Sequence, residues 1–281
     1  MSETPELSGP SRRVRRNRAI AAGLGLAVLG VAVTAGGMAI GSHTGRAAMA
    51  SVAQTSTPSP TAAPRPTPAQ VVAPAAVPTF DKKARSIDDP TSIWVVSDKL
   101  RPLNPVDFVP PDLVDVPVPH TWAPQLRKEA SDAVVALFAA ATSEAGLTLA
   151  SNSAYRSFDS QTSVYNDDVA ANGRDAADSL TARPGFSEHQ TGLAIDIGAD
   201  SGDCSLSACF ASTAEGTWLA ANAWRFGFLL RYPADKVPVT GFEFEPWHYR
   251  YIGTDLAKEM HDKGVTTLEE FFGLPAAPNY G

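Results

Sequence analysis

The order of apolar and polar positions divides the chain into distinct regions. Residues 19–41 carry no charge and are rich in Ala, Leu, Val and Ile. As a helix, this run would span about 34 Å at ~1.5 Å per residue, which exceeds the ~30 Å hydrocarbon core of a bilayer. The pattern therefore predicts a single transmembrane helix over residues 19–41.

The residues before this run carry a cluster of positive charge: Arg12, Arg13, Arg15, Arg16 and Arg18. Basic flanks stay on the cytoplasmic side, so we expect residues 1–18 to be cytoplasmic and the region beyond the helix to be extracytoplasmic. The alternative is a cleaved signal peptide and a secreted product, because Ala48-Met49-Ala50 resembles a cleavage site. The run is long for a signal peptide, which favours an uncleaved anchor and a single-pass protein of the cell membrane.

Residues 42–80 are rich in Pro, Thr and Ala and show no helical or strand period. Such a composition cannot bury a core, so we expect a disordered linker. Residues 81–281 then form the folded domain, of a size that suits one globular unit.

Apolar periodicity within this domain predicts a mixture of helices and short strands. We expect helices over residues 124–145, 157–169, 212–226, 254–263 and 267–272. We expect strands over residues 147–150, 193–197, 228–232 and 242–251. Because no regular βαβ alternation occurs, the predicted class is α+β, a small mixed or antiparallel sheet flanked by helices.

Charge and cysteine content narrow the possible functions. Residues 1–80 hold seven basic and two acidic residues, whereas residues 81–281 hold 16 basic and 28 acidic residues, a net charge of −12. A domain this acidic repels nucleic acid, so we exclude nucleic-acid binding; we expect a monomer. In an exported domain, Cys204 and Cys209 are expected to form a small local disulfide.

Candidate metal ligands lie in two apolar stretches. His189 and Asp196 belong to the stretch of residues 187–196, and His248 follows Glu245 by three residues. Asp196 lies between two isoleucines, where an unpaired carboxylate is expensive to bury and a metal ion would balance its charge. Two imidazoles and one carboxylate leave the fourth position of a tetrahedral zinc open for water. Pro246 argues for a break in the chain that could bring Glu245 close to His248.

From the residues alone, two alternatives remain open. His248 could be a core histidine whose ring nitrogens are hydrogen-bonded within the protein, and Asp196 could be one partner of a salt bridge. The other histidines are His43, His120 and His261, which are expected in linker, loop and surface-helix positions.

A resemblance to a known family adds to this interpretation. Over about residues 94–273, the chain resembles VanY-type D-alanyl-D-alanine carboxypeptidases, which are zinc peptidases. The resemblance is carried by Ser153-Ala154-Tyr155-Arg156-Ser157 with Gln161, by the stretch from Ser187 to Asp196, and by Glu245-Pro246-Trp247-His248.

The resemblance implies one zinc ion on the sheet, bound by His189, Asp196 and His248. It implies Glu245 as the catalytic base and Arg156 as the group that stabilises the oxyanion. It further implies that Gln161 and Ser187 contact the substrate, while Tyr155 and Trp247 wall the pocket. Arg231 and Tyr232 could reach the substrate or serve as a structural salt bridge and hydrogen bond.

The expected function is therefore removal of the C-terminal D-alanine from peptidoglycan stem peptides. An L,D-carboxypeptidase or an endopeptidase on the same scaffold is the first alternative. A zinc-stabilised wall-binding module without turnover is the second; Glu245 and Arg156 together argue against it, since binding alone needs neither. A serine hydrolase is set aside because the Gly-x-Ser-x-Gly motif is missing.

Overall fold

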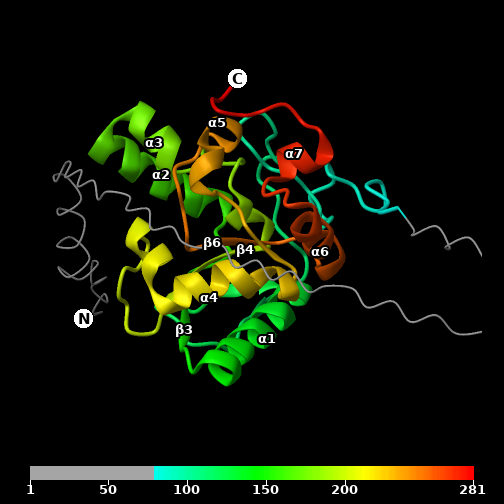
Figure 1. The fold of residues 1–281 in the computed structure, drawn as a ribbon. Coiled ribbons are helices and arrows are strands. Elements are labelled where there is room, and N and C mark those ends of the chain that lie inside the picture. Colours follow the sequence, from blue (N-terminus) through cyan, green and yellow to red (C-terminus); the bar gives the residue numbers. More distant parts are fainter. Residues whose placement is uncertain (1–78) are drawn as a thin grey trace, which may run out of the picture. The chain divides into compact units, whose positions relative to one another are not determined.

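The computed structural model of the chain describes residues 79–281 (Figure 1). The predicted cytoplasmic segment, transmembrane helix and nearly all of the predicted linker lie outside the described residues. Within residues 79–281, no helix combines the length and the apolar composition needed to span a bilayer. Phe80 stacks on Trp94 with ring centroids 5.5 Å apart, so the folded unit includes the last residue assigned to the linker.

The described region is an α+β fold around one antiparallel sheet. Four strands lie in the order β3-β4-β6-β5, and a separate hairpin pairs β1 with β2. The strands are β1 (Leu113–Asp115), β2 (Gln125–Arg127), β3 (Leu149–Ser153), β4 (Ala194–Ala199), β5 (Phe228–Leu230) and β6 (His248–Tyr251). The predicted class is confirmed, and every neighbouring pair of strands is antiparallel.

Helices surround this sheet (Figure 1). They are α1 (Lys128–Ala145), α2 (Phe158–Asn172), α3 (Arg174–Leu180), α4 (Ala214–Asn222), α5 (Val237–Thr240), α6 (Thr254–Lys263) and α7 (Leu268–Phe272). Short 3₁₀ turns are η1 (Glu188–Thr191), η2 (Ala208–Ser212), η3 (Ala223–Phe226) and η4 (Ala234–Lys236).

Helix boundaries follow local capping chemistry. Ser157 caps α2 as predicted, because its hydroxyl accepts a hydrogen bond from the backbone N–H of Ser160. Thr213, and not the expected Ser212, caps α4 by accepting from the N–H of Gly216. The first helix begins at Lys128 and not near residue 124, since the preceding three residues pair with β1. The predicted strand over 242–251 was too long: only His248–Tyr251 pairs as β6.

The two faces of the central sheet differ in chemistry because side chains alternate along a strand. Ile195, Ile197, Tyr249 and Tyr251 belong to the hydrophobic core. Asp196 and His248 alternate with them and therefore project from the opposite face. The sheet thus separates a packed apolar layer from a polar layer that holds the candidate site.

The predicted disulfide is confirmed. Cys204 and Cys209 are bonded, with their Cα atoms 5.5 Å apart. The bridge lies in the segment between β4 and α4.

Candidate metal centre

The strand register brings two of the predicted ligands together. Asp196 on β4 is the direct partner of His248 on β6, so their side chains leave the same face side by side. The Asp196 Oδ1 and His248 Nδ1 atoms are 3.3 Å apart. Residues 52 positions apart in sequence are therefore neighbours because of one antiparallel pairing.

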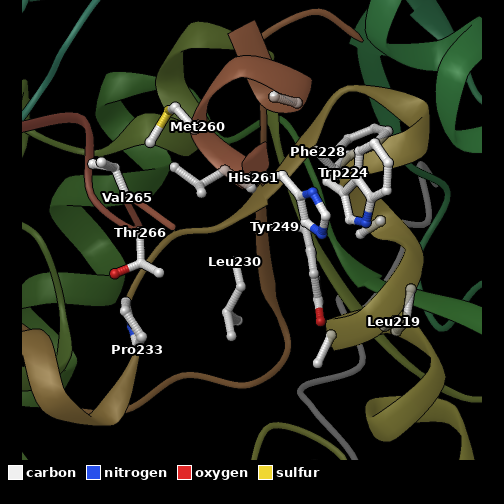
Figure 2. Close-up of a pocket in the computed structure, with 14 residues that line it drawn as sticks. Leu219, Trp224, Phe228, Leu230, Pro233, Tyr249, Met260, His261, Val265 and Thr266 are labelled. Atoms are coloured by element: carbon white, nitrogen blue, oxygen red, sulfur yellow. The ribbon is translucent and has the colours of Figure 1, made fainter. Parts of the chain in front are cut away.

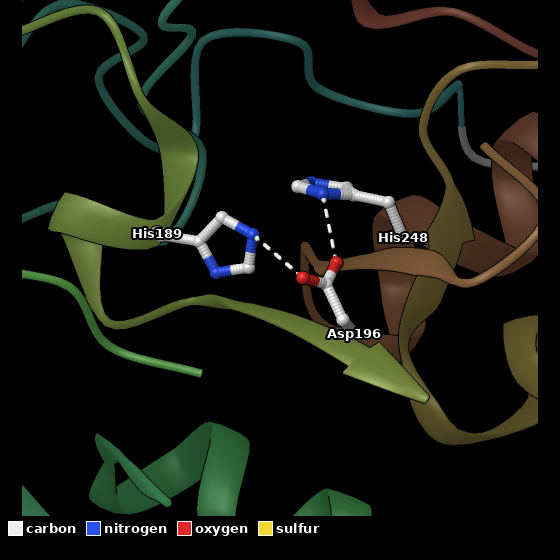
Figure 3. A group of neighbouring side chains, drawn as sticks. All are labelled: His189, Asp196 and His248. Carbon is white, nitrogen blue, oxygen red and sulfur yellow. Dashed lines mark ion pairs between the residues drawn. The ribbon is translucent and has the colours of Figure 1, made fainter. Parts of the chain in front are cut away.

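The third predicted ligand comes from the 3₁₀ turn η1. His189 lies 3.4 Å from Asp196, measured from Nε2 to Oδ2. Figure 3 shows Asp196 between the two imidazole rings, with one oxygen facing each ring. The turn ends at Gly192, which has a φ of 66° and leads into β4. A side chain there would press against Leu113 and Arg127, so glycine serves both the turn and the packing.

A hydrogen bond fixes the ligand atom of His189. Its Nδ1 lies 2.7 Å from the carbonyl oxygen of Ala154, and since a carbonyl only accepts, Nδ1 carries the proton. Burial lowers the pKa of His189, so the ring is neutral and Nε2 presents a lone pair to Asp196. Two acceptor atoms 3.4 Å apart repel each other unless a cation lies between them.

The donor set fits a zinc ion. Single ligand atoms of His189, Asp196 and His248 all lie within 4.8 Å of one another, and all three residues are buried. Ligands about 2.0–2.1 Å from a tetrahedral zinc are ~3.3–3.4 Å apart, which matches the two nitrogen–oxygen separations given above. Among the described residues, Asp196 Oδ1 is buried without a hydrogen-bond partner, as expected for an atom reserved for a metal.

His248 is surrounded by carboxylates. Its Nδ1 faces Asp196 and lies 3.6 Å from Glu245 Oε2, while its Nε2 lies 3.3 Å from Glu188 Oε2. Burial alone would lower the pKa of His248, but the facing Asp196 and Glu188 raise it to about 9. A metal must therefore displace a proton from this ring.

Glu245 reaches the site through a tight turn. The backbone N–H of His248 donates to the carbonyl oxygen of Glu245 at 3.1 Å, which closes the turn over Pro246 and Trp247. The predicted break at Pro246 is thus observed, and it brings the two side chains together. Burial raises the pKa of Glu245 from 4.5 to about 8, and the charge of Asp196 adds to the effect. A carboxyl group with this pKa can accept and return a proton near neutral pH.

Arg156 is held rigidly at the edge of the same site. Its Nη1 donates to Gln161 Oε1 at 2.9 Å and its Nη2 donates to Ser153 Oγ at 3.0 Å. Ser153 is the β3 partner of Asp196 in the sheet register. Burial lowers the pKa of Arg156, whereas the nearby carboxylates of Asp196 and Glu245 raise it. The guanidinium is therefore close enough to the carboxylates of the candidate centre to be affected by their charge.

The predicted substrate-binding residues lie at different depths. Gln161 is fully buried, and its Nε2 donates to the carbonyl oxygen of Ala182 at 2.7 Å while its Oε1 accepts from Arg156, so both ends of the amide are engaged. Ser187 is also buried, directly before η1. Tyr155 is half-buried, and Trp247 is half-buried against the hydrophobic core. Their contact with substrate stays a prediction.

Sequence reasoning missed Glu188 and left Arg231 undecided. Glu188 is 1% exposed, and its carboxylate contacts His248, Arg231 and Arg250. Arg231 is fully buried and pairs with Glu188 and with Glu269 of α7, which identifies the structural salt bridge as its role. The signal available in the sequence was an acidic residue directly before the predicted ligand His189.

An apolar cavity of about 170 Å³ lies elsewhere, between α4, η3, β5 and α6. Figure 2 shows its lining, which includes Trp224, Leu230, Tyr249 and Met260. Tyr249 follows His248 but projects from the opposite face of the sheet. None of the predicted catalytic or metal-binding residues lines this cavity, so it does not belong to the candidate centre.

Comparison with known proteins agrees with this geometry. The family model of VanY, D-alanyl-D-alanine carboxypeptidase, matches residues 123–254, which contain every predicted site residue. YodJ of Bacillus subtilis, which is named as a carboxypeptidase, is 41% identical over 192 residues, covering 66% of this chain and 69% of YodJ. The chain spans only 35% of the D-alanyl-D-alanine carboxypeptidase of Enterococcus faecium, to which it is 41% identical over 120 residues.

Solved structures of carboxypeptidases are also similar to this chain. The LD-carboxypeptidase LdcB has a TM-score of 0.61 and 41% identity, over 66% of this chain and 87% of LdcB. A vancomycin-resistance D,D-pentapeptidase, VanY, in complex with Zn(II) has a TM-score of 0.53 and 32% identity, over 64% of this chain and 98% of that one.

Proposed function

Because the chain belongs to the VanY family of D-alanyl-D-alanine carboxypeptidases, we propose that it is a zinc peptidase of the cell wall. It removes the C-terminal D-alanine from peptidoglycan stem peptides. The observation that carries this proposal is the buried group of His189, Asp196 and His248, whose ligand atoms lie within 4.8 Å, with Glu245 beside it. A metal-binding module without turnover would need neither this carboxyl group nor Arg156.

His189 through Nε2, Asp196 through its carboxylate and His248 through Nδ1 would hold the zinc ion. When bound, zinc supplies a Lewis acid that polarises the scissile carbonyl and makes water more acidic. Glu245 takes the proton from the attacking water and then passes it to the nitrogen of the leaving D-alanine. In the metal-free chain, burial raises the pKa of Glu245 to about 8. A zinc ion beside the carboxyl group would lower this pKa and keep Glu245 ionised, as a base requires.

Arg156 stabilises the negative charge that develops on the carbonyl oxygen. Gln161 and Ser153 hold its guanidinium before the substrate arrives, so little reorganisation is needed during the reaction. Besides the predicted contact with substrate, Gln161 thus positions Arg156.

The configuration of the residue before the scissile bond distinguishes two candidate reactions. A D,D-carboxypeptidase cleaves after a D-residue, whereas an L,D-carboxypeptidase cleaves the D-alanine that follows an L-centre. The similarity to LdcB favours the L,D reaction as a second candidate, at 41% identity. Both reactions release D-alanine and use the same metal centre.

Defined stem peptides test this proposal. The purified full chain, loaded with zinc, is incubated with tetrapeptide and pentapeptide stems, and the products are weighed by mass spectrometry. Loss of one D-alanine from the pentapeptide supports the D,D reaction, and loss of D-alanine from the tetrapeptide supports the L,D reaction. Release of no D-alanine from either peptide would contradict the proposed function.

We also propose that residues 19–41 anchor the chain in the cell membrane, with the catalytic domain outside. The apolar run and the arginines before it support this location. Fractionation and protease treatment of intact cells that lack a wall test it: the domain should remain with the membrane and be digested from outside. A chain found entirely in the culture medium would instead support cleavage and secretion.

A further inference from the structure

Glu188 is buried next to the candidate metal centre but takes no part in the mechanism given above. It opens the turn η1, directly before the ligand His189, and its side chain is fully buried. Its Oε1 accepts from Arg231 Nε at 2.8 Å and from Arg250 Nη1 at 3.0 Å. Its Oε2 faces His248 Nε2 at 3.3 Å. The two oxygens thus have different partners: two arginines on one, a histidine on the other.

The partners keep Glu188 ionised. Guanidinium groups only donate hydrogen bonds, so Oε1 must accept from both. Glu269 binds Arg231 through both of its oxygens, at 2.6 and 3.0 Å. With two acidic and two basic side chains, this buried group of Glu188, Glu269, Arg231 and Arg250 is neutral as a whole.

A negative Oε2 that faces His248 Nε2 favours a proton on that nitrogen. The proton on Nε2 leaves Nδ1 of the neutral ring with its lone pair, and Nδ1 is the atom that faces Asp196 at 3.3 Å. We propose that Glu188 is a positioning residue, which holds His248 in the Nε2-protonated form so that Nδ1 is free to bind the metal. A histidine ligand that donates its other N–H to a carboxylate is a common arrangement at metal sites.

The surrounding contacts make this position rigid. Arg250 donates to the carbonyl oxygens of Ile93 and Val95 at 3.1 and 2.8 Å, and Arg231 is tied to α7 through Glu269. Glu188 and the ligand His189 share one turn. The contact with His248 therefore joins the turn that carries one ligand to the strand that carries another.

The inference rests on the proposed metal site and not on the identity of the peptide. A chain that binds zinc but cleaves no stem peptide contradicts the proposed function and leaves the position of the His248 proton open to measurement.

The first test uses the unaltered full chain. Long-range ¹H–¹⁵N spectra of the zinc-loaded protein report which nitrogen of each histidine carries the proton. The ring signals are assigned with single variants of His43, His120 and His261. We expect His248 to carry its proton on Nε2 and His189 on Nδ1. A proton on Nδ1 of His248 would overturn the inference.

The second test compares two matched substitutions, Glu188→Gln and Glu269→Gln. Each removes one charge that faces Arg231, but only Glu188 contacts His248. In Glu188→Gln the amide oxygen should turn toward the arginines. The amide N–H group then faces His248 Nε2 and shifts the ring proton to Nδ1.

We expect Glu188→Gln to weaken zinc binding by 10- to 100-fold, measured by competition with a chromophoric chelator, and Glu269→Gln to change it less than threefold. Circular dichroism confirms that each variant is folded. Equal losses of zinc affinity in both variants, or a dissociation constant for Glu188→Gln within threefold of the unaltered chain, would overturn the inference.

Discussion

Replacing Glu245 by glutamine separates metal binding from proton transfer. The amide has the shape of the carboxyl group but cannot accept the proton of the attacking water. Glu245 lies 3.6 Å from a ligand nitrogen of His248 and is not itself one of the three clustered ligands, so we expect zinc binding to be retained. General acid–base catalysis contributes typically ~10²–10⁴-fold, and turnover of a stem peptide should fall by at least this factor.

The same substitution should not destabilise the metal-free protein. The Glu245 side chain is 13% exposed, and burial raises its pKa from 4.5 to about 8. A carboxyl group whose pKa is raised on folding does not reduce the free energy of unfolding below pH 4.5. Its destabilising effect grows as the pH rises to 8. At ~1.4 kcal/mol per pKa unit, the cost at pH 7 is at most roughly 3.5 kcal/mol. A neutral amide removes this cost, so the melting temperature in EDTA should stay constant or rise.

The assay measures D-alanine release, zinc content and thermal unfolding for Glu245→Gln. Glu243→Gln is the matched control, since Glu243 is exposed two residues earlier in the same segment and should behave as the unaltered chain. A Glu245→Gln variant with full turnover would refute the assignment of the base. A variant that is inactive because it has lost its zinc would refute the separation of the two roles.

Other predictions follow from the same contacts. Arg156→Lys loses the forked hydrogen bonds to Gln161 and Ser153, so kcat should fall by about 10²-fold with zinc content unchanged; unchanged kcat would contradict the oxyanion role. Zinc must displace the proton of His248, whose pKa is raised to about 9, so below pH 9 the apparent zinc affinity should fall about tenfold per pH unit. Competition titrations between pH 6 and 8 test this, and a pH-independent affinity would speak against it. Replacing both Cys204 and Cys209 by serine should cost about 2 kcal/mol of unfolding free energy, measured in urea, and leave turnover intact; loss of zinc in this variant would show that the loop supports the centre.

Much of the centre was accessible from the sequence because ligand chemistry is rare in apolar strands. Asp196 between two isoleucines indicated either a bound cation or a salt bridge, and the resemblance to the VanY family favoured the cation. Pro246 predicted the break in the chain that brings Glu245 close to His248. The pairing of Asp196 with His248 could not be derived from local pattern, since register between distant strands depends on the whole sheet.

Other features depend on contacts that no local pattern contains. Glu188 is stabilised by Arg231 and Arg250, which lie 43 and 62 residues away. The apolar residues Phe242 and Phe244 suggested a longer strand, but the turn over Pro246 begins the pairing only at His248. The residues 125–127 fit a helical stripe, yet pairing with β1 draws them into a strand.

Anomalous X-ray diffraction at the zinc absorption edge, from crystals of the zinc-loaded chain, tests the central claim most directly. The account predicts one peak within bonding distance of His189 Nε2, a carboxylate oxygen of Asp196 and His248 Nδ1. A zinc ion bound elsewhere on the chain, with no peak between these three side chains, would contradict it.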